Sequence, residues 1–136
     1  MERVQELLTG SGAFALSFLV SLALLALFAL LYSLMTAHRE MALIRNGNTA
    51  AALSLGGAIV GLVIPIGKAV AQSTGLVDLA VWAAIAFVAQ AVAYAVTAAL
   101  VPHLSRTVEA NQISSGILLA AIAVSTGLLN AAAMTT

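Results

Sequence analysis

Few polar side chains lie inside the long apolar stretches of this sequence, and their chemistry is limited to hydrogen bonding. Gln90, Tyr94 and Thr97 are spaced by four and three residues, so on a helix they share one face. Asn130 is a second amide inside an apolar stretch. Neutral amides donate and accept hydrogen bonds but do not take up protons near neutral pH. These four residues predict either hydrogen bonds between helices or the lining of a path for a solute.

Most ionisable side chains gather in two polar segments, residues 36–48 and 102–112. The candidate residues for a site there are His38, Arg39, Arg45, His103 and Arg106. Arginines beside apolar helices are typical of cytoplasmic flanks, but such cations at two helix starts are also suited to bind an anion or phosphate. Two histidines with two glutamates are potential metal ligands, yet their dispersed spacing matches no zinc pattern. We therefore predict neither a metal nor another cofactor.

Composition excludes several classes of function. The chain has no cysteine, which rules out disulfides, thiolate metal sites and thiol catalysis. It shows no nucleophile–base–acid arrangement and no glycine-rich nucleotide loop, so we expect that it is not an enzyme. Five Lys or Arg balance five Asp or Glu, and this leaves no basic face for nucleic acid.

The apolar content predicts a membrane protein. Hydrophobic residues make up 62% of the chain and charged residues 7%, whereas soluble domains are about 45–50% apolar. Four stretches reach the roughly 20 residues that a membrane helix needs: 13–35, 49–71, 79–101 and 113–134. We predict one all-α membrane domain over residues 1–136, surrounded by lipid. The first stretch is longer than the apolar core of a secretory signal, and we expect it to remain uncleaved.

The two halves of the chain resemble each other. Arg45-Asn46-Gly47-Asn48-Thr49 precedes the second stretch much as Glu109-Ala110-Asn111-Gln112-Ile113 precedes the fourth. A two-helix unit returns the chain to the side on which it began, so the predicted fold is two parallel tandem helix-hairpin repeats, residues 13–71 and 79–134. Asn48 and Asn111 are expected to cap the helices that start there.

Small residues predict which helices pack together, because they let backbones approach in a lipid environment. The candidate packing residues are Gly57, Gly61 and Pro65 in the second stretch and Gly116, Ala120 and Gly127 in the fourth. Pro65 is expected to kink its helix near Gly61. The first stretch has leucines around the whole helix, Leu25 among them, which favours lipid contact on most sides. The second and fourth helices are therefore the predicted inner pair.

Positive charge predicts the orientation. Arg39, Arg45 and Arg106 lie on one side of the membrane, against Arg3 and Lys68 on the other. Because positive charge collects on the cytoplasmic side, we expect both polar segments in the cytoplasm and both termini outside it.

Four short segments point to a family: Leu43-Ile44-Arg45, Asn48-Thr49-Ala50-Ala51, Val63-Ile64-Pro65 and Asn130-Ala131-Ala132-Ala133-Met134. In this order and spacing the chain resembles the YjfL-like family of bacterial inner-membrane proteins, a domain-of-unknown-function family. The resemblance covers nearly the whole chain, although Gln112-Ile113-Ser114 departs from the Asn-Thr-Ala-Ala pattern of the first half. It implies a multi-pass inner-membrane location and supplies no catalytic residues.

Two functions follow from these features. The first is a non-enzymatic scaffold or accessory subunit that self-associates through its small-residue faces as a homo-oligomer and offers its polar segments to a cytoplasmic protein partner. The alternative is a homo-oligomeric passive channel for an ion or small solute, lined by the polar residues of the third and fourth stretches. The side chain of Gln90 distinguishes them, since it must face either a neighbouring helix or a continuous wet path.

Overall fold

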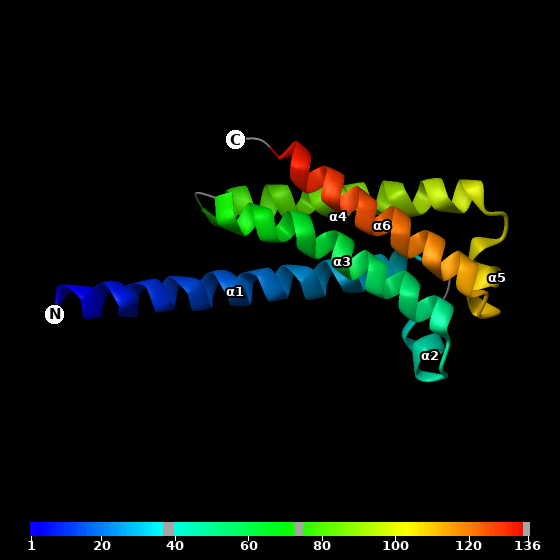
Figure 1. The fold of residues 1–136 in the computed structure, drawn as a ribbon, viewed down its shortest axis with the longest axis horizontal. Coiled ribbons are helices and arrows are strands. Elements are labelled where there is room, and N and C mark those ends of the chain that lie inside the picture. The colour runs from blue at the N-terminus through cyan, green and yellow to red at the C-terminus, as the bar shows by residue number, and fades with distance from the viewer. Residues whose placement is uncertain (37–39, 73–74, 135–136) are drawn as a thin grey trace.

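The computed structural model describes residues 1–36, 40–72 and 75–134, and every regular element in these ranges is a helix (Figure 1). The long helices are α1 (Glu2–Met35), α3 (Thr49–Gln72), α4 (Leu76–Leu100) and α6 (Ile113–Ala133). All four are long and apolar enough to cross a membrane, which confirms the predicted all-α membrane class. Two short helices, α2 (Glu40–Arg45) and α5 (Leu104–Glu109), lie in the polar segments that the sequence predicted as loops.

The long helices differ from the predicted spans mainly at their N-terminal ends. α1 begins at Glu2 rather than Ala13, because polar residues can continue a helix beyond its apolar stretch. Its 34 residues give a length of about 51 Å, against about 30 Å for the hydrocarbon core of a bilayer. α4 begins at Leu76, which puts Asp78 in the first turn, where the helix dipole favours a carboxylate.

α3 and α6 form the closest pair of helices and run in the same direction from the loop end, the end of the bundle where α2 and α5 lie (Figure 1). A Cβ atom at Gly57 would overlap the backbone of Ala120, and one at Gly127 would overlap the backbone of Gly61. At Gly116 it would stand 2.6 Å from the carbonyl oxygen of Ala50. The backbones therefore touch where the sequence predicted small-residue packing.

This internal contact corrects the expectation that the chain self-associates through its small-residue faces. Gly57, Gly61, Gly116 and Gly127 are all buried within the one chain, so these small-residue faces are not available to a second copy. Pro65 is also buried, and α3 continues past it to Gln72. The kink at this proline and the duplication of the two-helix unit stay predictions.

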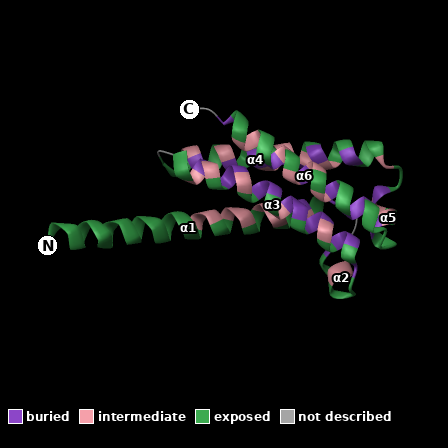
Figure 2. Cartoon of the chain, viewed as in Figure 1, coloured by how far each residue is buried: buried purple, intermediate pink, exposed green. Residues whose placement is uncertain are grey.

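α1 is divided into two halves with different surroundings (Figure 2). Residues 2–19 are all exposed, whereas Leu24, Leu25 and Phe28 pack against a buried cluster on α3 and α4. The cluster consists of Leu62, Ile66, Ala83 and Ala86. The expectation that Leu25 faces lipid is thus wrong, because a bulky apolar side chain suits lipid and a helix interface equally well and composition alone does not separate them.

Adjacent glycines test the contact between α3 and α6. Gly56→Ala adds a methyl group to open space and removes a helix penalty of about 1 kcal/mol, so this variant should be no less stable than the original chain. Gly57→Ala forces the same methyl group against Ala120 and should cost about 1–3 kcal/mol. The measurement is unfolding by sodium dodecyl sulfate, followed by the fluorescence of Trp82, the only tryptophan. Equal stability of the two variants would contradict the packing.

Candidate functional site

Asn48 joins the two polar segments at the loop end. Its side-chain oxygen accepts a hydrogen bond from the backbone N–H of Ala51 at 2.8 Å, which caps the start of α3. Its amide nitrogen donates to the backbone carbonyls of Val108 at 2.8 Å and Glu109 at 3.3 Å. One buried side chain therefore satisfies backbone groups at the start of α3 and at the end of α5.

Asn111 differs from the expectation that it caps α6. Its backbone is left-handed, with a φ of 58°, and its side-chain oxygen accepts from the N–H of Ala50 at 3.0 Å. The residue at the cap position of α6 is Gln112, which makes no side-chain cap bond. Because Asn111 precedes the cap position, its side chain reaches α3 instead of α6. Both asparagines therefore accept hydrogen bonds from backbone N–H groups in the first turn of α3.

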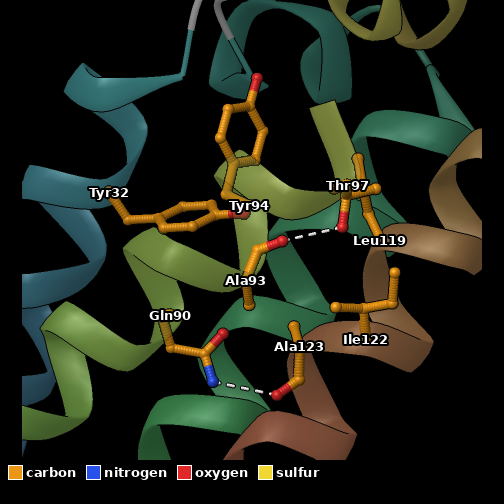
Figure 3. A pocket seen from close by; sticks show the side chains of 8 residues that line it. All are labelled: Tyr32, Gln90, Ala93, Tyr94, Thr97, Leu119, Ile122 and Ala123. Carbon is orange, nitrogen blue, oxygen red and sulfur yellow. Dashed lines mark hydrogen bonds between the residues drawn. The ribbon is translucent and has the colours of Figure 1, made fainter. Parts of the chain in front are cut away.

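Gln90 lies at the point where α4 meets α6 (Figure 3). Its side chain is 1% exposed, and Nε2 donates to the carbonyl oxygen of Ala123 at 2.9 Å. The Oε1 atom has no hydrogen-bond partner among the described residues. Within one chain, Gln90 therefore packs against a neighbouring helix and leaves one buried acceptor unsatisfied.

A narrow crevice lies beside Gln90. It holds about 150 Å³ of empty space, with no room for a sphere the size of water. Its walls are formed by Tyr32, Gln90, Ala93, Tyr94, Thr97, Leu119, Ile122 and Ala123 (Figure 3). The crevice thus brings together three of the four predicted polar residues, but in this conformation it is too narrow to be a wet path.

The other polar residues make different contacts from those expected. Thr97 donates its hydroxyl to the carbonyl of Ala93 in its own helix at 2.9 Å, so it does not link two helices. Tyr94 contacts Tyr32 of α1 edge to face, with ring centroids 5.9 Å apart. Asn130 is absent from the crevice wall, and its Nδ2 atom is buried without a partner among the described residues.

A buried carboxylate at the loop end was missed by sequence reasoning. Glu40 is 1% exposed, and its Oε1 accepts a hydrogen bond from the hydroxyl of Ser54 on α3 at 3.3 Å. The Ser54 side chain also hydrogen-bonds with that of Tyr32 on α1. Glu40 lies in the polar segment 36–48, and neither the composition nor the spacing of that segment predicts a buried side chain. The available signal was the presence of Tyr32 and Ser54, two hydroxyl side chains near the ends of consecutive apolar stretches.

The predicted basic residues are not gathered into one site. His38 and Arg39 lie outside the described residues. Arg45 is exposed at the end of α2, while His103 and Arg106 line an open groove that does not include Arg45. Over the described ranges, no group of three or more His, Cys, Asp or Glu side chains is placed to hold a metal ion. An anion or phosphate site at the two polar segments stays a prediction.

Comparison with known proteins gives consistent matches over nearly the whole chain. The family model described as Domain of Unknown Function (DUF350) matches residues 6–134. The UPF0719 inner membrane protein YjfL of Escherichia coli strain K12 is 34% identical over 123 residues, which are 90% of this chain and 93% of the relative. The protein of the same name in Escherichia coli O157:H7 matches with the same values. No solved structure matches the chain.

The membrane location expected from the composition is confirmed, since four helices can cross a membrane and the relatives are named inner membrane proteins. The chain is therefore a multi-pass protein of the bacterial inner membrane, and it belongs to the family described as Domain of Unknown Function (DUF350).

Proposed function

We propose that the protein is a non-enzymatic membrane subunit that associates with a second copy of itself through the N-terminal half of α1. The observation that supports this function best is that residues 2–19 are all exposed, over half of a helix that is long and apolar enough to cross the membrane. The small-residue faces of α3 and α6 are buried against each other, so the proposed association uses the exposed half of α1 instead.

The sequence of α1 supports pairing with an identical helix. Thr9, Ala13 and Ser17 recur every four residues along the exposed half, and Ser21 continues this small-residue stripe. A two-fold axis along the membrane normal would place each of these residues opposite its own copy, as in closed symmetric dimers. The hydroxyl of Ser21 already donates to the carbonyl of Ser17, so its polar group is satisfied before the helices meet.

Cysteine cross-linking tests this interface in a chain that has no cysteine of its own. Ala13 lies on the stripe, while Ala15 lies about 200° around the same helix, and both are exposed. We expect Ala13→Cys to form disulfide-linked dimers in oxidised membranes at several times the yield of Ala15→Cys, because a disulfide needs Cα atoms within about 7 Å. Equal yields from the two variants would contradict the α1 interface.

We further propose that the loop end faces the cytoplasm. Arg45 and Arg106 lie on α2 and α5 at this end, and α6 finishes at the opposite end (Figure 1). The positive-inside rule favours this orientation, although Arg3 and Lys68 lie toward the other side. It would place the exposed parts of α2 and α5 where a cytoplasmic protein partner can bind them.

Reporter fusions test the orientation. A periplasm-active reporter, such as alkaline phosphatase, should be active when fused to the C-terminus and inactive when fused after Gly47, which has open space around it. A cytoplasm-active reporter should show the reverse pattern. The opposite result from both reporters would invert the topology while leaving the four spans in place.

A passive channel is the second candidate function, and the unsatisfied Oε1 atom of Gln90 favours it. A buried acceptor without a partner is costly, and a passing hydrogen-bond donor would satisfy it. The path would follow the crevice between α1, α4 and α6 and would require the Tyr32–Tyr94 contact to open. The described residues that line the crevice include no carboxylate, and the buried Glu40 belongs to α2, outside the four long helices.

Flux measurements on liposomes separate the two functions. A channel would pass a solute down its gradient, and Gln90→Leu would change the rate without changing the yield of the Ala13→Cys dimer. A subunit without a channel would pass nothing, and Gln90→Leu would only remove a hydrogen bond of about 1 kcal/mol. Accumulation of a solute against its gradient, driven by an imposed proton gradient, would contradict both functions.

A further inference from the structure

An open groove lies at the loop end, beside the last turns of α1 and α4. Its volume is about 390 Å³, and its lining residues are Met35, Tyr94, Ala98, His103, Leu104, Ser105 and Arg106. Met35 and Ala98 are exposed residues near the ends of two spanning helices. The groove therefore opens at the level where hydrocarbon chains meet phospholipid headgroups.

The groove is lined by basic and by apolar side chains, which we call its basic wall and its apolar wall. Arg106 and His103 provide the basic wall, and both are exposed. His103 stands at the N-cap of α5 with a left-handed φ of 56°, and its side chain makes no cap bond, so the imidazole is not used to hold that helix. Met35 and Ala98 supply the apolar wall. None of the described residues that line the groove is acidic.

We propose that this groove binds an anionic phospholipid, with the phosphate at Arg106 and His103 and an acyl chain along Met35 and Ala98. A guanidinium presents a planar fork of N–H donors that matches two phosphate oxygens. Basic pockets between membrane helices are suited to anionic headgroups. The apolar wall selects a lipid over free phosphate, because free phosphate gains nothing from contact with Met35. This inference does not depend on the proposed dimer.

Two arginines in similar settings provide a matched comparison. Arg106 lines the groove, whereas Arg45 is also exposed, on the other short helix, and lies outside the groove. The purified full-length protein, loaded with equal amounts of phosphatidylglycerol and phosphatidylcholine, is examined by native mass spectrometry. We expect it to retain phosphatidylglycerol preferentially, and we expect Arg106→Gln to lower that retention about tenfold, equivalent to about 1.4 kcal/mol. Arg45→Gln should retain it as the original chain does.

Three results would overturn the proposal. Equal loss of phosphatidylglycerol in Arg45→Gln and Arg106→Gln would assign the attraction to the general charge of the polar segments. Equal retention of the two lipids would remove the preference for an anionic headgroup, and displacement of phosphatidylglycerol by inorganic phosphate would identify a free-anion site. If Arg106→Gln fails to fold, the test is the thermal unfolding of the original chain, followed by Trp82 fluorescence. Phosphatidylglycerol must then raise the midpoint temperature of unfolding more than phosphatidylcholine does.

Discussion

The rest of the structure depends on the direct backbone contact between α3 and α6. Lipid tails provide no hydrophobic drive for helix association, so the two helices are held by close van der Waals packing and by polar groups that need each other. At Gly57, Gly61 and Gly127 there is no space for even one methyl group. This spacing brings the carbonyl of Ala123 within reach of Gln90, and the start of α3 within reach of Asn111. α1 packs against α3 and α4 along only the C-terminal half of its length.

Apolar length and small-residue spacing were sufficient to predict the membrane class, the spans and the glycines at which α3 and α6 touch. The side of α1 that packs was not predictable, because leucine suits both lipid and protein neighbours. The target of Asn111 was missed for a different reason, since a cap across helices depends on tertiary structure that local spacing does not contain. Glu40 shows the same limit: its burial follows from α2 folding against α3, while its sequence neighbours indicate solvent.

The polar groups of this protein lie at the junctions between helices rather than along one continuous path. Asn48, Asn111 and Glu40 connect the short helices and turns of the loop end to α3. Gln90 and Tyr94 connect α4 to α6 and to α1 near the crevice. Hydrogen bonds between helices, such as that of Gln90, are individually worth about 0.6–2 kcal/mol in a membrane. Their distribution indicates that these polar groups hold the helices in a fixed arrangement.

The hydrogen bond between Ala50 and Asn111 has a consequence for biosynthesis, because its partners are 61 positions apart in the chain. At translation rates of about 5–20 residues per second, the ribosome completes α3 at Gln72 about 2–8 s before it adds Asn111. Until Asn111 and α6 are made, the N–H of Ala50 lacks its hydrogen-bond partner, and Gly57 and Gly61 lack the helix that covers them in the folded protein. The nascent first hairpin is therefore an incomplete species whose glycine face distinguishes it from the finished protein. Insertion factors and membrane proteases would meet this face on every stalled or truncated chain.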